Sequence, residues 1–118
     1  MAYMLLIHEE VGQRRQRSEA EGHEVYDRMV KFAGSLKKRG VLRGVESLAS
    51  PDESSSRVKV RSGKAHVVDG PFAEAKEMVG GFFLIDVATR EEALAIAREC
   101  PAAEWATVEV RATGPCYT

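Results

Sequence analysis

Asp69 and His8 are the two side chains of this sequence whose type and setting could move a proton. Asp69 opens the stretch Asp69-Gly70-Pro71-Phe72. Gly70 can adopt a positive φ and Pro71 fixes φ at about −65°, so the stretch forms a rigid corner. Such a corner can hold a carboxylate so that it points into a cleft, where it would act as a base or bind a polar ligand. Alternatively, the carboxylate accepts hydrogen bonds from the amides of its own turn. Asp69 is therefore a catalytic candidate, with both alternatives open.

His8 follows a short apolar run, residues 3–7, that has the length of a buried strand. Strand alternation places His8 on the same face as Met4 and Leu6, at a sheet end where a cleft could open. A lone histidine is more often structural or solvated, but imidazole is well suited to proton transfer near neutral pH. His8 is the second catalytic candidate. The histidines at positions 8, 23 and 66 show no HxxH or HxH spacing, so no metal site is predicted.

Four further charged residues are candidates for contacting a polar ligand. Glu74 and Lys76 follow the corner, where they either line the cleft or belong to a solvated face. Asp86 closes an apolar run, and a carboxylate buried there would need a cationic partner. Arg43 or Arg111, on a neighbouring predicted strand, can supply that partner. The resulting ion pair with Asp86 would only stabilise the fold, or its arginine would also bind an anionic ligand.

The composition is that of one globular domain over residues 1–118. Hydrophobic residues make up 44% and charged residues 30%, and 17 basic side chains nearly balance 18 acidic ones. The basic residues are not concentrated enough to bind a nucleic acid backbone, so no nucleic-acid partner is expected. No apolar run has the roughly 20 residues that cross a bilayer, and the start lacks the features of a signal peptide. We therefore expect a cytoplasmic protein without membrane contact.

The sequence carries no recognisable cofactor motif. Neither GxGxxG nor a P-loop is present, and a strand bulge or a close approach by the backbone of a partner chain explains Gly80-Gly81 better than a phosphate cradle does. Cys100 and Cys116 form neither a CxxC pair nor a disulfide framework. We therefore expect no bound cofactor and no thiol chemistry.

Periodicity and capping signals predict the order of the elements. Ser18 with Glu21 and Thr89 with Glu92 are capping-box pairs that begin two helices. A glycine-bearing turn between two alternating runs predicts a hairpin. The predicted elements are a strand at 3–8, a helix from 18 to 40, a strand at 41–49, a hairpin at 57–68, a strand at 81–88, a helix from 89 to 100 and a strand at 105–112.

This order predicts an α+β fold of the ferredoxin-like βαββαβ type with an inserted β-hairpin. Two helices would cover one face of an antiparallel sheet. The strand at 81–88 is apolar on both faces, so the uncovered face of the sheet needs another chain packed against it. We therefore expect a homodimer that pairs sheet to sheet.

Several segments resemble the YCII-related family, in the branch named for its DGPF motif. The segments are YMLLIH (3–8), GVLRGVESL (40–48), VDGPFAEAKEMVGGFFLIDV (68–87), EEALAIARECPAA (91–103) and VEVR (108–111). The resemblance spans nearly the whole chain. It implies a dimeric α+β barrel, the architecture also used by muconolactone isomerase-like enzymes and antibiotic-biosynthesis monooxygenases.

For activity, the resemblance points in two directions. Some YCII-type relatives act on chlorinated aromatic degradation products through a His–Asp pair. The histidine of that pair lies on the first helix, at a place where this sequence has Met29. Other members of the DGPF branch are encoded beside, or fused with, extracytoplasmic-function sigma factors.

Three functions therefore stay open. The first is binding of a small polar molecule between helices and sheet, with isomerase- or lyase-type proton transfer by Asp69 and His8. The second is a non-catalytic regulatory or interaction module associated with an extracytoplasmic-function sigma factor. The third is a structural dimer without a ligand.

Overall fold

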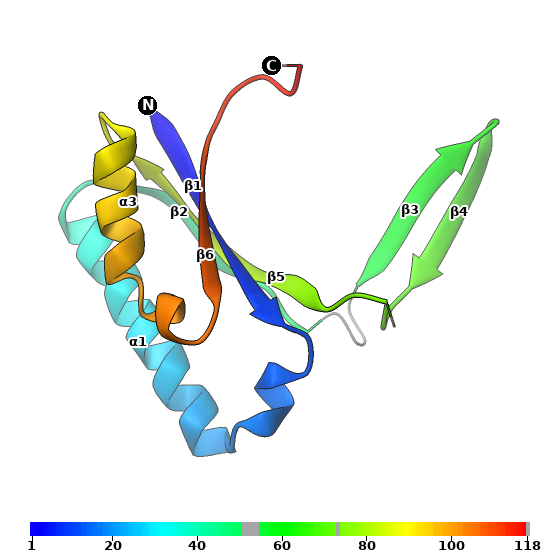
Figure 1. Cartoon of the computed structure of the whole chain (residues 1–118), viewed down its shortest axis with the longest axis horizontal. Coiled ribbons are helices and arrows are strands. Elements are labelled where there is room, and N and C mark those ends of the chain that lie inside the picture. The colour runs from blue at the N-terminus through cyan, green and yellow to red at the C-terminus, as the bar shows by residue number, and fades with distance from the viewer. Residues whose placement is uncertain (51–54, 73, 118) are drawn as a thin grey trace.

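A four-stranded antiparallel sheet with two helices on one face forms the body of the molecule, and a separate two-stranded arm projects from it (Figure 1). This arrangement comes from a computed structural model that describes residues 1–50, 55–72 and 74–117. The strands and helices are β1 (Ala2–Glu10), α1 (Glu19–Lys38), β2 (Leu42–Ser47), β3 (Ser56–Arg61), β4 (Lys64–Asp69), β5 (Glu77–Asp86), α3 (Arg90–Glu99) and β6 (Thr107–Ala112). Short 3₁₀ helices occupy Gln13–Gln16 and Pro101–Glu104.

The four-stranded sheet has the order β2-β5-β1-β6, and every neighbouring pair is antiparallel. This is the strand order of the ferredoxin-like fold, so the predicted fold class is confirmed. β3 and β4 pair with each other in a sheet of their own. The hairpin is therefore an insertion between β2 and β5, as the sequence predicted.

The helices begin and end where the capping signals predicted. The Ser18 hydroxyl accepts a hydrogen bond from the Glu21 amide at 3.1 Å, and the Ser18 amide donates to the Glu21 carboxylate at 3.0 Å. Gly40 follows α1 with a φ of 75°, a conformation that favours glycine. At the start of α3, Thr89 accepts from the Glu92 amide at 3.2 Å. None of the helices in the described residues is long and apolar enough to cross a membrane.

The core lies between the helices and one face of the sheet. Every second residue of β1 points into it, and Leu5, Leu36 and Ile85 are fully buried there. Phe32 of α1 and Phe83 of β5 meet edge to face, with ring centroids 5.2 Å apart. Burying each such side chain contributes about 1.5–3 kcal/mol, which holds α1 against β5.

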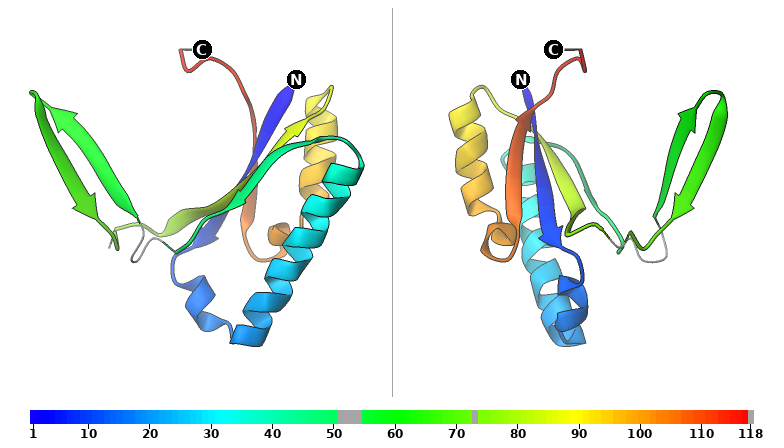
Figure 2. Two further views of the ribbon diagram at one scale, coloured as in Figure 1. Left: turned by 180° about the vertical axis from the view of Figure 1, so that it is seen from behind. Right: turned by 45° about the vertical axis from the view of Figure 1, so that its right-hand side comes forward.

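The opposite face of the sheet has no helix over it (Figure 2). Alternation places Met4, Leu6, Phe82 and Leu84 on this open face, where they are only partly buried. β5 is thus apolar on both faces, as the sequence predicted. No described element packs against one of these two faces. Sheet-to-sheet pairing with a second copy stays a prediction.

The arm formed by β3 and β4 stands clear of the body (Figures 1 and 2). Every residue of both strands is exposed. The cross-strand register places Val58 opposite Val67 on one face and Lys59 opposite His66 on the other. The first face is apolar at Val58, Val60, Ala65 and Val67, and it ends at the polar pair Ser56 and Asp69. The second face carries four cationic side chains, those of Arg57, Lys59, Arg61 and Lys64.

Candidate ligand cavity between α1 and the sheet

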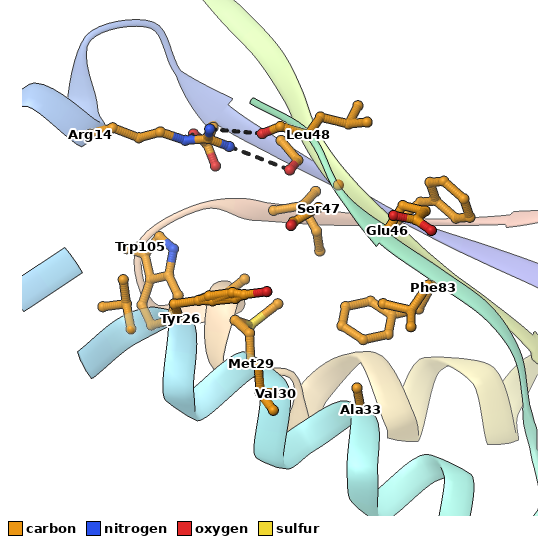
Figure 3. A pocket seen from close by; sticks show the side chains of 18 of the residues that line it. Arg14, Tyr26, Met29, Val30, Ala33, Glu46, Ser47, Leu48, Phe83 and Trp105 are labelled. Atoms are coloured by element: carbon orange, nitrogen blue, oxygen red, sulfur yellow. Dashed lines mark hydrogen bonds and ion pairs between the residues drawn. The ribbon is translucent and has the colours of Figure 1, made fainter. Parts of the chain in front are cut away.

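A cavity of about 850 Å³ lies between α1 and the strands β2 and β5 (Figure 3). Its wall is mainly apolar. The α1 side of the wall consists of Gly22, Val25, Tyr26, Met29, Val30 and Ala33. Phe83 and Trp105 contribute aromatic rings from other elements. The volume lies in the range of about 300–1,000 Å³ that is typical of small-molecule sites.

Met29 stands in this wall at the place where the family resemblance puts a histidine. It is partly buried and packs against the core. A thioether therefore replaces the imidazole at this point, and no histidine is among the described residues that line the cavity. The described residues thus do not assemble a His–Asp pair here.

One end of the cavity is polar because Glu9 and Arg14 meet there. Glu9 is only 7% exposed, and it is the one charged side chain buried to this degree among the described residues. Its Oε1 accepts a hydrogen bond from Arg14 Nε at 2.5 Å. Arg14 also donates to the carbonyl oxygens of Leu48 at 2.8 Å and Gly80 at 3.3 Å. The guanidinium therefore balances the buried carboxylate and ties β1 to the neighbouring ends of β2 and β5.

Gly80 and Gly81 make room for this end of the cavity. The register between β1 and β5 shifts here, which leaves Gly80 as a bulge. A β-carbon on Gly80 would collide with the Glu9 carboxylate, at 2.7 Å from its Cδ. One on Gly81 would lie 2.8 Å from the carbonyl oxygen of Glu46 in β2. The bulge predicted at this pair is confirmed. The backbone that approaches Gly81 belongs to this chain's own β2, and an approach by a partner chain stays a prediction.

Trp105 forms another part of the wall, and two arginine side chains lie over its ring. The guanidinium carbons of Arg17 and Arg28 lie 5.7 and 5.4 Å from its ring centroid. Arg28 also donates to Glu104, and this hydrogen bond lowers the pKa of the Glu104 carboxyl from its ordinary value. Arg17 lines the cavity and lies near the Glu21 carboxyl, whose pKa is lowered by hydrogen bonds with Ser18 and, to a smaller extent, by the charge of Arg17. Both arginines beside Trp105 therefore have a carboxylate nearby.

The two catalytic candidates from the sequence lie outside this cavity and in different sheets. Asp69 ends β4, and its carboxylate accepts a hydrogen bond from Ser56 Oγ at 2.6 Å. His8 faces the open side of the four-stranded sheet, where its Nε2 lies 2.7 Å from Glu109 Oε1. No cluster of three or more His, Cys, Asp or Glu side chains within the described ranges is placed to hold a metal ion. The catalytic roles of Asp69 and His8 stay predictions.

The corner after Asp69 lies at the root of the arm. The Gly70–Pro71 peptide bond is cis. Phe72 follows it, and the guanidinium carbon of Arg57 lies 3.8 Å from the centroid of its ring. A second hollow of about 600 Å³ borders Pro71, Phe72 and Arg57. The corner is thus placed to join the arm to the body.

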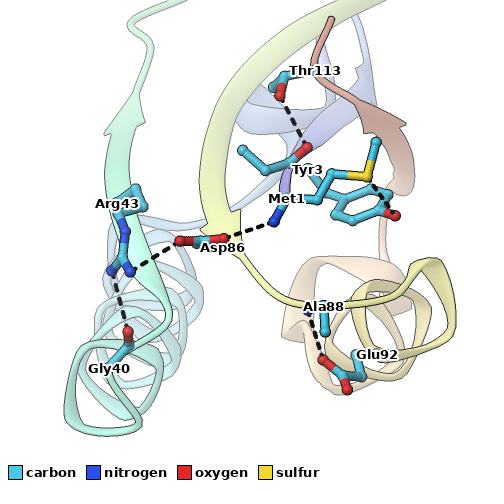
Figure 4. A network of polar contacts seen from close by, with 9 residues as sticks. Met1, Tyr3, Gly40, Arg43, Asp86, Ala88, Glu92 and Thr113 are labelled. Atoms are coloured by element: carbon cyan, nitrogen blue, oxygen red, sulfur yellow. Dashed lines mark hydrogen bonds and ion pairs between the residues drawn. The ribbon is translucent and has the colours of Figure 1, made fainter.

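The four candidates for ligand contact also lie away from the main cavity. Asp86 and Arg43 form the expected ion pair at 3.1 Å (Figure 4). The amine of Met1 donates to the other Asp86 oxygen at 3.1 Å, and this hydrogen bond is the main reason why the pKa of Asp86 is lowered. Glu74 and Lys76 are exposed near the arm root. Their roles in ligand binding stay predictions.

Comparison with known proteins places the chain in a family. A model of the YCII-related domain matches residues 1–115. The chain belongs to the YCII-related family. An uncharacterized protein of Rhizobium meliloti (strain 1021) is 45% identical to it over 49 residues, which are 42% of this chain and 40% of that protein. The matched segment thus spans less than half of that relative, and the resemblance found in the sequence is confirmed at the level of the family.

In this YCII-related protein, Glu9 is the cavity residue that sequence reasoning missed. One signal was available, because Glu9 is in phase with the core-facing residues Leu5 and Ile7 of the same strand. An acidic side chain at a core-facing position needs a compensating charge. The partner, Arg14, lies in a polar connection whose 3₁₀ turn has no capping signal. Tertiary packing alone brings the two together.

Proposed function

We propose that this protein binds a small molecule in the cavity between α1 and the sheet. The observation that carries the proposal is a buried carboxylate, that of Glu9, at one end of a mainly apolar space of about 850 Å³. The space is open to solvent, and the apolar side chains of Tyr26, Val30, Val45 and Leu48 in its wall are exposed, so a ligand would remove apolar surface from water. A bound molecule with an apolar body would fill the space and face the carboxylate.

Proton transfer of the isomerase or lyase type is the chemistry that such a site supports best. Glu9 supplies a carboxylate inside the cavity, and a general base must lie within about 2.6–3.2 Å of the group it deprotonates. Asp69 and His8 would act only on a molecule bound elsewhere, at the arm root or on the open sheet face.

A ligand screen with a cavity-filling variant tests the proposal. Ala33→Phe would fill part of the cavity, and Ala95→Phe on the exposed side of α3 is the matched control. A ligand at 100 times its dissociation constant stabilises a protein by about 2.7 kcal/mol, which raises the thermal midpoint by several degrees. We expect small aromatic compounds to give this shift in the wild type and Ala95→Phe, but not in Ala33→Phe. A shift in all three proteins, or in none, contradicts the proposal.

The same screen with Asp69→Ala separates the cavity from the corner. A ligand held between α1 and the sheet should stabilise Asp69→Ala as much as the wild type. If Asp69→Ala alone loses the shift, the ligand binds at the arm root, and Asp69 is part of the site.

We further propose that the protein is a cytoplasmic homodimer of the DGPF branch. The DGPF motif stands at residues 69–72, and Cys100 and Cys116 are free thiols, which suits a reducing compartment. The open sheet face supports the dimer, because it offers a row of partly buried apolar side chains that a second copy would cover. A stable interface buries about 1,600 Å² in total.

Analytical ultracentrifugation of two variants tests the dimer. Leu84→Glu would place a carboxylate in the centre of the proposed interface, where burying an unpaired charge is costly. Ala95→Glu adds the same group to the exposed side of α3. We expect wild type and Ala95→Glu to sediment as dimers and Leu84→Glu as a monomer. A monomeric wild type, or a dimeric Leu84→Glu, contradicts the proposal.

The arm favours a second candidate function, a non-catalytic interaction module associated with an extracytoplasmic-function sigma factor. A two-stranded hairpin is marginally stable by itself in water, and this one has every residue exposed. Its four cations face one way without an acidic residue among them. An acidic surface of a partner protein would complement that face.

Binding to a purified sigma factor of this class, measured by biolayer interferometry, tests the second candidate. The double variant Lys59→Glu and Arg61→Glu reverses charge on the arm, and Ala33→Phe changes only the cavity. We expect the first to abolish binding and the second to leave it intact, with weaker binding at higher salt. Binding that neither variant weakens excludes the arm as the contact.

A further inference from the structure

The Glu9 carboxylate uses only one of its two oxygens within the protein. Oε1 accepts the hydrogen bond from Arg14 Nε, and Glu9 Oε2 has no hydrogen-bond partner among the residues described. Glu9 lines the cavity, and its side chain is 8% exposed. Oε2 is not among the fully buried atoms that lack a partner, so it is open to the cavity, where a hydrogen bond to this charged acceptor would favour a ligand that brings a donor.

The position of Oε2 is fixed on two sides. Arg14 holds the carboxylate through Nε while its other nitrogens are committed to the carbonyl oxygens of Leu48 and Gly80. Gly80 lies against Oε2, so closely that a β-carbon there would collide with it. The carboxylate therefore keeps a single orientation, which is the condition for selecting one donor position on a ligand.

The surrounding charges decide which kind of donor fits. Arg14 already balances Glu9, so this ion pair has no net charge. An ammonium group would bring an unbalanced charge beside this neutral pair, and a carboxylate would be repelled by Oε2. An uncharged hydroxyl donates to Oε2 without bringing a further charge into a mainly apolar space.

We propose that Glu9 Oε2 selects ligands that carry an uncharged hydroxyl group on an apolar, ring-sized body. This inference rests on the proposed binding function of the same cavity and names the class of molecule that it takes. The apolar body lies among Met29, Ala33, Phe83 and Trp105, and the hydroxyl donates to Oε2.

Two probes of nearly equal shape test this selection. Toluene and p-cresol differ by one hydroxyl group, and their dissociation constants are measured by ligand-observed NMR titration. We expect wild type to bind p-cresol about tenfold more tightly than toluene, because a hydrogen bond to a charged acceptor is gained. In Glu9→Gln, the side-chain oxygen keeps the hydrogen bond from Arg14, and an NH₂ group replaces Oε2 at the cavity. The charged acceptor is lost, so the preference for p-cresol over toluene should fall sharply. The double variant Glu9→Leu with Arg14→Met removes the whole pair, and there the preference should vanish while toluene still binds.

The outcomes distinguish a failure of the hydroxyl selection by Glu9 from a failure of the proposed ligand binding in the cavity. Equal affinity for the two probes in the wild type, or an unchanged p-cresol preference in the double variant, overturns the hydroxyl selection and leaves the cavity function standing. Failure of both probes to bind, or binding that Ala33→Phe does not weaken, overturns the cavity function itself. Tighter binding of p-toluate or 4-methylbenzylammonium than of p-cresol overturns the choice of an uncharged donor.

Discussion

The carboxylate of Glu9 occupies the space that a side chain on Gly80 would need. The two residues lie on adjacent strands, and the bulge in β5 turns the backbone of Gly80 towards the carboxylate. Arg14 then closes the arrangement by binding Glu9 and the carbonyl oxygen of Gly80. A charge can be buried at this end of the cavity because the glycine leaves room and the arginine balances it.

Gly80→Ala tests this relationship. The added carbon would displace the Glu9 carboxylate, which can move only by giving up its hydrogen bond to Arg14. We expect a loss of about 1–3 kcal/mol in the free energy of unfolding, measured by urea denaturation. Gly44→Ala is the control, because its β-carbon would make only an ordinary contact with Leu84 Cβ at 3.8 Å. Equal effects of the two substitutions would show that the space at Gly80 is not occupied as described.

Gly34 offers a stabilising substitution on the outer side of α1. It is exposed in the middle of the helix, and an added β-carbon would meet no atom within 4 Å. Alanine is a better helix former, so Gly34→Ala should raise the free energy of unfolding by about 0.5–1 kcal/mol. Gly40→Ala should lower it by about 1–2 kcal/mol, because Gly40 has a φ of 75°. Chemical denaturation of both variants checks the opposite signs, and a loss of stability in Gly34→Ala would contradict the expectation.

The two cysteines should differ sharply in reactivity. Burial raises the pKa of the Cys100 thiol, and this residue is 2% exposed, whereas Cys116 is exposed. Because the thiolate is the reactive form, an aromatic disulfide reagent should modify Cys116 quickly and Cys100 only after unfolding. Cys116→Ser should remove the fast phase of the reaction. A fast phase that persists in this variant would show that Cys100 is accessible.

The ion pair between Arg28 and Glu104 should contribute to stability at neutral pH and lose that contribution in acid. The hydrogen bond from Arg28 lowers the folded-state pKa of Glu104 from 4.5. A carboxyl with a lowered folded-state pKa stabilises the protein above its unfolded pKa, and the effect disappears as the pH falls through the folded value. Glu104→Gln should therefore reduce the acid sensitivity of the thermal midpoint below pH 4.5. Glu91→Gln, at an exposed position of α3, is the control and should leave the profile unchanged. Identical profiles for Glu104→Gln and wild type would contradict the role of the pair.

Local sequence determined the elements and the strand faces of this protein. Ser18 and Thr89 cap the helices because each side chain accepts a hydrogen bond from an amide only three residues further along the chain. The alternation of β1 and β5 separates core face from open face because successive strand side chains point in opposite directions. The family resemblance, carried by contiguous segments, is likewise a property of the sequence, and the family model confirms it.

Only the tertiary structure decided where the cavity lies and which residues are polar within it. Arg14 reaches the carbonyl oxygens of Leu48 and Gly80, which lie 34 and 66 positions away in the chain, so no local pattern could pair them. The same holds for Arg28 and Glu104, 76 positions apart. The sequence predicts a rigid corner at Asp69, yet the carboxylate of Asp69 accepts a hydrogen bond from Ser56 across the arm. Long-range packing sets the solvation of each charged group, and the contrast between a buried Glu9 and an exposed Asp69 exists only once the chain has folded.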